Sequence, residues 1–142
     1  MKNFLMTLAV TLTAVCTIQA QEIVGKWKTI DDNTGKEKSI VEIYEKGGKY
    51  YGKVIKLLNP SKPNPTCDNC EGDEKGKPIE GLVIIKGLEK KEGEYTGGKI
   101  TDPESGKQYK CAAKLNGKDK LDVRGYVGFS LLGRTQTWIK AN

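Results

Sequence analysis

The feature that most constrains this chain is an alternation of apolar and polar residues that recurs from Val24 to Lys140. Side chains of a β-strand point alternately to opposite faces, so a period of two predicts strands with one buried face. After residue 20, no stretch keeps the helical apolar period over the roughly 10 residues that a stable helix needs. Only residues 128–133 are expected to allow a helical turn. The sequence therefore predicts an all-β protein.

Turn residues divide the chain into about eight such stretches. Gly47-Gly48 and Asn116-Gly117 are typical of tight hairpin turns. The strands are expected at residues 24–30, 39–45, 49–58, 81–86, 94–101, 107–115, 120–126 and 134–139. Because eight antiparallel strands joined by short turns close naturally into a barrel, we predict a single small antiparallel β-barrel over residues 21–142. A two-sheet β-sandwich is the alternative.

The first 20 residues are typical of an export signal. Lys2 supplies a positive charge, an apolar run follows from Phe4 to Cys16, and Ala20 precedes the expected cleavage before Gln21. The run is shorter than the roughly 20 apolar residues of a transmembrane helix. We therefore expect residues 1–20 to be a signal peptide, and the mature protein to be periplasmic or secreted, without a membrane span.

Residues 59–78, from Asn59 to Pro78, interrupt the strand pattern with four of the five prolines. A loop this long in a small domain is either functional or covers an open end of the fold. In an exported protein, Cys67 and Cys70 are expected to form a disulfide that clamps a turn, with a redox pair or metal ligands as alternatives. The next strand is apolar on both faces at residues 82–85, which predicts that both of its faces are buried.

The basic residues are mostly lysine and are spread along the whole chain. Without Lys2, 23 of the 24 Lys and Arg residues remain against 18 acidic ones, which gives a net charge of +5 for residues 21–142. Only two of the cations are arginine, whereas arginine is the residue that recognises phosphate most specifically. We therefore expect the charge to serve solubility, and no nucleic-acid partner.

The chain contains no histidine, which excludes histidine-dependent nucleophile systems and the histidine sites of most catalytic zinc enzymes. A carboxylate pair such as Asp102 and Asp122 could still cleave a glycan, if both faced one cleft. Otherwise no catalytic residue, metal site or cofactor is expected. Cys111 alternates with charged residues on its strand, which predicts a buried core thiol.

The last strand carries the best candidate site. Alternation places Arg134, Gln136 and Trp138 on one face, and an inward Trp138 would carry the other two inward with it. A buried arginine needs an anionic partner, either a protein carboxylate or a ligand. We predict a pocket at one end of the lumen, with Arg134 and Gln136 as polar anchors and with aromatic walls formed by Trp27, Trp138 and Tyr126. The alternative is a structural arginine that stacks on an indole.

Several motifs resemble a known family. They are the segment from Trp27 to Lys36, the Cys67–Cys70 loop, the Asp102-Pro103 turn, and above all residues 123–138, from Val123 to Trp138. Together they resemble the bacterial exported family named domain of unknown function 2147. The resemblance implies a single calycin-like barrel and brings no activity with it. A looser similarity to lipocalins, in Gly25-Lys26-Trp27 and Arg134, implies an arginine packed over that tryptophan; the lipocalin Thr-Asp-Tyr turn is missing.

These observations predict a non-enzymatic exported barrel that binds a small molecule or a component of the cell envelope. The alternative function is a protein-interaction module that acts through the loop from Asn59 to Pro78, because prolines and a clamped turn would preorganise that surface. A monomer is expected in either case.

Overall fold

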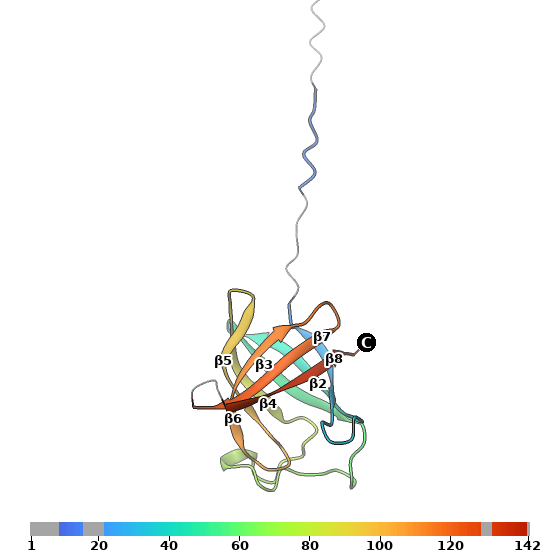
Figure 1. Ribbon diagram of the computed structural model, residues 1–142, viewed down its shortest axis with the longest axis vertical. Coiled ribbons are helices and arrows are strands. Elements are labelled where there is room, and N and C mark those ends of the chain that lie inside the picture. The colour runs from blue at the N-terminus through green and yellow to red at the C-terminus, as the bar shows by residue number, and fades with distance from the viewer. Residues whose placement is uncertain (1–8, 16–21, 129–131, 142) are drawn as a thin grey trace, which may run out of the picture.

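The computed structural model describes residues 9–15, 22–128 and 132–141. Eight strands form a closed barrel in which each strand neighbours the next in chain order (Figure 1). The strands are β1 (Gly25–Ile30), β2 (Glu37–Lys46), β3 (Lys49–Leu57), β4 (Val83–Lys91), β5 (Glu94–Thr101), β6 (Gln108–Leu115), β7 (Lys120–Val127) and β8 (Leu132–Lys140). The predicted all-β barrel is confirmed, and closure excludes the β-sandwich.

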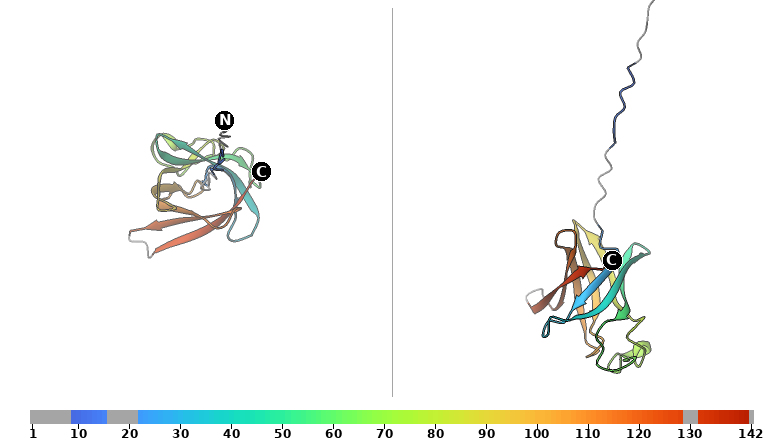
Figure 2. Two further views of the ribbon diagram at one scale, coloured as in Figure 1. Left: turned by 90° about the horizontal axis from the view of Figure 1, so that it is seen from above. Right: turned by 90° about the vertical axis from the view of Figure 1, so that its right-hand side faces the viewer.

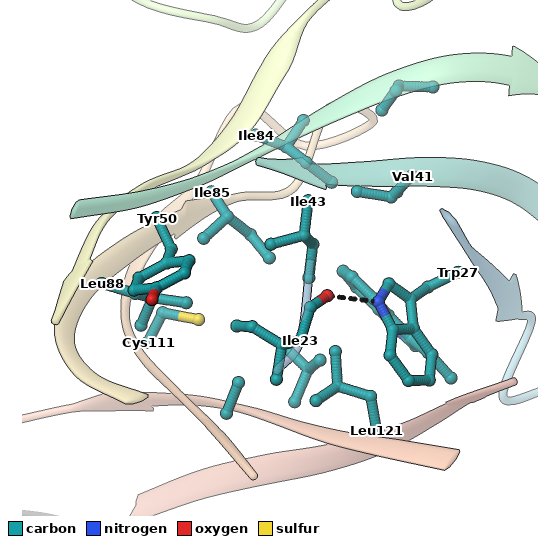
Figure 3. Close-up of a cluster of buried hydrophobic side chains, with 14 of the residues drawn as sticks. Ile23, Trp27, Val41, Ile43, Tyr50, Ile84, Ile85, Leu88, Cys111 and Leu121 are labelled. Carbon is teal, nitrogen blue, oxygen red and sulfur yellow. Dashed lines mark hydrogen bonds between the residues drawn. The ribbon is translucent and has the colours of Figure 1, made fainter. Parts of the chain in front are cut away.

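Side chains from every strand fill the middle of the barrel. Trp27, Ile43, Ile85 and Leu121 are all at most 2% exposed and belong to one buried cluster (Figure 3). Ile23, which precedes β1, is 0% exposed and lies among them. The lumen of the described barrel is therefore packed with apolar side chains around Trp27 rather than left as a deep open cup.

The strand expected at 81–86 is β4, and it runs longer than the pattern indicated. Ile84 and Ile85 are adjacent and both buried, so this strand is covered on both faces as predicted. The loop after β3 adds Cys67 and Ile79 to the same buried cluster that contains Ile84 and Ile85.

The loop between β3 and β4 packs over one end of the barrel (Figure 1). It contains the predicted disulfide between Cys67 and Cys70 and a short 3-10 helix at Gly72–Glu74. The side chain of Asn69 donates to the carbonyl of Glu104 at 3.1 Å, in the turn between β5 and β6. Gly106 of the same turn has φ +73°, and a Cβ there would lie 1.9 Å from the Asn69 carbonyl oxygen. The disulfide tip is thus seated on the barrel by a contact that only glycine permits.

Closure of the barrel is uneven between β1 and β8. These strands share only the pairs Trp27↔Lys140 and Lys28↔Ile139, at the C-terminal end of β8. By contrast, β7 and β8 remain paired from Lys120↔Ile139 to Val127↔Leu132. The N-terminal half of β8 therefore leaves β1 and reaches outward with β7 as a hairpin (Figure 2). This opening is called the β1–β8 seam below.

The predicted signal peptide lies largely outside the described residues. Of its described part, Val10, Leu12 and Val15 are at least 77% exposed. Of the residues expected to allow a helical turn, 128–133, residues 129–131 lie outside the described residues, and Leu132 and Gly133 belong to β8. No helix of the described chain has the length and hydrophobicity needed to cross a bilayer.

Candidate functional site

The concave face of β8 carries the predicted site residues. Trp138 pairs with Leu121, Gln136 with Val123 and Arg134 with Gly125. Leu121 and Val123 are both buried, and paired residues of antiparallel strands share a face. The prediction that Arg134, Gln136 and Trp138 share the inward face is confirmed.

Burial changes steeply along this face. Trp138 is 1% exposed and Gln136 is half-buried, whereas the Arg134 side chain is 66% exposed. The expectation that Arg134 would be buried is wrong, because alternation sets the direction of a side chain but not how much material covers it. At the height of Arg134, β1 no longer pairs with β8, and the β1–β8 seam lets solvent reach the guanidinium.

Asp32, in the turn after β1, connects the two sides of the seam. Its Oδ2 accepts a hydrogen bond from Nη2 of Arg134 and another, at 2.8 Å, from Nε2 of Gln136. The Oε1 of Gln136 in turn accepts the indole N–H of Trp138 at 3.2 Å. A continuous chain of hydrogen bonds therefore runs from an exposed ion pair to a buried indole.

The turn that carries Asp32 is stabilised by hydrogen bonds to the side chain of the preceding residue, Asp31. The Oδ1 of Asp31 accepts the backbone N–H groups of Asn33 at 2.8 Å and Thr34 at 2.9 Å. The bonds from Thr34 and Asn33 lower the pKa of the Asp31 carboxyl below its ordinary value, because they stabilise its charged form. Asp31 is thus committed to the turn, and Asp32 is free to reach across the seam.

The other two predicted aromatic residues lie away from this network. Trp27 is 2% exposed, and its Nε1 donates to the Ile23 carbonyl at 2.8 Å (Figure 3). Tyr126 pairs with Gly133, on the face of the hairpin opposite to that of Arg134. Among the described residues, Arg134 makes no cation–ring contact, so the packing of Arg134 over Trp27 implied by the lipocalin resemblance is not found.

Sequence reasoning missed Asp32. A signal was present, since an arginine on an inward face requires an anionic partner, but Asp31-Asp32-Asn33 has the composition of an ordinary tight turn and does not indicate a partner on the last strand. Asp32 and Arg134 are 102 residues apart, and only closure of the barrel brings them together.

The two carboxylates considered for glycan cleavage, Asp102 and Asp122, lie far apart, and each already accepts hydrogen bonds from neighbouring residues. Asp102 accepts bonds from Glu104 and Ser105 within its own turn, whereas Asp122 accepts the hydroxyl of Thr137. Asp122 pairs with Lys114 near one end of β6 and Asp102 lies beyond the other end, so they are roughly 20 Å apart at about 3.3 Å per residue. A glycosidase pair needs about 5 to 9.5 Å, so these two do not form one.

Cys111 is the one free cysteine among the described residues, and it is buried. Burial raises the pKa of its thiol to about 12, because the thiolate would lose its hydration. The prediction of a buried core thiol is confirmed.

The closed eight-stranded barrel defines the class of protein as a lipocalin-like β-barrel. A similar solved structure is protein HP1028 from the human pathogen Helicobacter pylori, which is described as belonging to the lipocalin family. The two chains are 25% identical with a TM-score of 0.76, and the match covers 87% of this chain and 85% of that one. No curated protein matches this chain.

Residues 25–140 match the family described as "Uncharacterized protein conserved in bacteria (DUF2147)", and the chain belongs to this family. The resemblance seen in the sequence motifs is thereby confirmed. The family description names no activity.

Proposed function

We propose that the protein is a non-enzymatic, exported binding protein that takes a small molecule with an anionic group at the β1–β8 seam. The observation that carries the proposal is the exposed guanidinium of Arg134 on the concave face, held together with Gln136 by the single carboxylate of Asp32. A lipocalin-like barrel is a fold suited to small ligands, and it supports this reading by analogy.

Arg134 and Gln136 would bind the anionic group of the ligand in place of the Asp32 carboxylate. An arginine fork and an adjacent amide match the geometry of a carboxylate or phosphate. Asp32 occupies that position in the structure, so an anionic group that enters the seam competes with it. The exchange costs little, because an exposed ion pair contributes only about 0 to 1 kcal/mol.

Trp138 and Trp27 would support this site from the core and would not contact the ligand directly. Both indoles are almost fully buried, and Trp138 fixes the side chain of Gln136 through its N–H. We propose that they hold the anchors in position, while the ligand itself meets Arg134 and Gln136. Tyr126 lies on the outer face of the hairpin, and its predicted part in binding stays a prediction.

The test is an NMR titration that uses the two tryptophans as paired reporters. The chain has two indole N–H groups, one bonded to Gln136 in the proposed site and one to the Ile23 carbonyl deeper in the barrel. With dodecanoate, glucuronate and inorganic phosphate as probes, we expect at least one to shift the Trp138 indole and Gln136 amide signals and to leave the Trp27 indole unchanged.

The same probe should cause no shift in the Arg134→Ala variant. Arg134→Lys should keep weakened binding, because it retains the charge but loses the fork. If every probe leaves the Trp138 and Gln136 signals in place, or moves both indoles equally, the seam is not the site and Arg134 is structural.

The alternative function, an interaction module at residues 59–78, has a narrower basis in the structure. Cys67 and Cys70 of this loop are buried, whereas residues 60–64 are continuously exposed. A partner would have to recognise that exposed stretch. Removal of residues 61–64 should then abolish partner binding and leave the Trp138 titration intact.

A further inference from the structure

A groove on the outside of the barrel is lined by none of the residues that form the β1–β8 seam. It has a volume of about 730 Å³ and lies between the outer face of β2 and β3 and the loop that precedes β4. Tyr44, Tyr51, Lys46, Lys77, Glu74 and Lys86 are among its lining residues. This volume is within the range of about 300 to 1,000 Å³ that is typical of small-molecule sites.

Two tyrosines form an aromatic platform in the groove. Tyr44 and Tyr51 are directly paired across β2 and β3, and their rings stack with centroids 5.8 Å apart and planes 20° apart. Both side chains are half-buried, and neither hydroxyl is hydrogen-bonded to any residue that the structure describes. The platform therefore offers apolar ring surface together with two unused hydroxyl groups.

The charge left uncommitted in the groove is positive. Glu74 is paired with Lys86, whereas Glu80, whose Oε1 accepts the backbone N–H of Leu57 at 3.0 Å, forms no ion pair with any described residue. Lys46 and Lys77 form no ion pair with any part of the described chain. Two unpaired ammonium groups against one unpaired carboxylate leave a net positive charge beside the aromatic platform, which favours a ligand that is itself anionic.

We propose that this groove binds an acidic saccharide. A sugar ring has one face of C–H groups that packs on an aromatic ring and an edge of hydroxyl groups that pair with Tyr, Lys and Glu side chains. Carboxylates on the sugar would pair with Lys46 and Lys77. The groove runs along an exposed surface, and its lining mixes aromatic, cationic and acidic side chains, which suits a hydroxyl-rich chain better than a lipid tail.

The experiment is calorimetric titration of the intact protein with a short oligogalacturonate, with maltohexaose as the neutral probe and AMP as the phosphate probe. We expect the oligogalacturonate to bind and the other two to bind at least tenfold more weakly. In a double variant, Lys46→Gln with Lys77→Gln, its affinity should fall roughly three- to tenfold, since exposed ion pairs are individually weak.

The matched control is the double variant Lys107→Gln with Lys110→Gln, which removes the same charge from exposed positions on and next to β6. It should stay within twofold of the unchanged protein. If both double variants lose the same affinity for oligogalacturonate, the effect comes from net charge and not from the groove. If maltohexaose binds as tightly as oligogalacturonate, or AMP binds more tightly, the ligand is not an acidic saccharide. Arg134→Ala should leave oligogalacturonate binding intact, so this proposal and that for the seam fail separately.

Discussion

Ile23 gives the sharpest prediction about how the barrel is held together. It precedes β1, yet it is 0% exposed, and its carbonyl accepts the indole N–H of Trp27. Truncation to Ala removes the buried side chain but keeps that carbonyl, so the change isolates packing from hydrogen bonding. Replacing a buried Ile by Ala costs about 2 to 5 kcal/mol, from lost burial and the cavity left behind.

Val24 is the matched control because it is adjacent in sequence and 45% exposed. Val24→Ala should cost about 0.5 kcal/mol or less, as expected for a change at the surface. The assay is urea denaturation of residues 21–142, followed by tryptophan fluorescence, since both indoles are buried. A typical domain has only about 5 to 15 kcal/mol of stability, so the Ile23→Ala transition should move clearly to lower urea.

The reasoning would be refuted by equal unfolding midpoints for Ile23→Ala and Val24→Ala. That result would mean that Ile23 is not part of the core in solution. The barrel would then be closed at this end by the strands alone.

Three further changes probe the site, the loop and the core. Gln136→Met removes the acceptor of the buried Trp138 indole N–H and should cost about 1 to 3 kcal/mol in urea denaturation, whereas an unchanged midpoint would show that the bond is dispensable. Gly106→Ala should destabilise far more than the roughly 1 kcal/mol expected at Gly117, whose φ is +76° but which has open space around it; equal losses would contradict the seating of the disulfide tip. Cys111, with its pKa raised to about 12, should resist a thiol reagent at pH 8 until urea unfolds the protein, and prompt labelling of the native state would contradict its burial.

The Cys111 shift also fixes the sign of one pH effect. Its folded pKa is above the ordinary value of 9.0, so the folded state holds the proton more tightly than the unfolded chain. The corresponding stability is fully present below pH 9 and is lost as the pH rises toward 12. Cys111→Ala should therefore be less sensitive to alkaline pH than the unchanged protein.

The strands were predictable from the sequence because their signals are local. Alternation and turn pairs such as Gly47-Gly48 act within a few residues, and alternation also puts Tyr44 on the face of β2 opposite to that of the buried Val41 and Ile43. The Gly47-Gly48 turn could have predicted the Tyr44↔Tyr51 pair as well, because the two tyrosines lie symmetrically about it. Short-range sequence signals can therefore predict the aromatic platform of the groove, but not the position of the loop that forms its other wall.

The features that escaped prediction depend on contacts that are distant in sequence. The exposure of Arg134 follows from where β1 stops pairing with β8, and no pattern within β8 records that. Asp32 was missed for the same reason, as its partner is on the last strand. Ile23 was missed because it lies before the first strand and carries no periodic signal.

The measurement that tests the central claim most directly is native mass spectrometry of the protein purified from the cells that naturally produce it, compared with Arg134→Ala and Asp32→Asn. We expect a mass excess that disappears on denaturation, is lost in Arg134→Ala and is retained at higher occupancy in Asp32→Asn, where the competing charge is gone. Circular dichroism would show that each variant keeps its β-structure. An empty protein in all three samples, or the same excess in folded Arg134→Ala as in the unchanged protein, would contradict ligand binding at the β1–β8 seam.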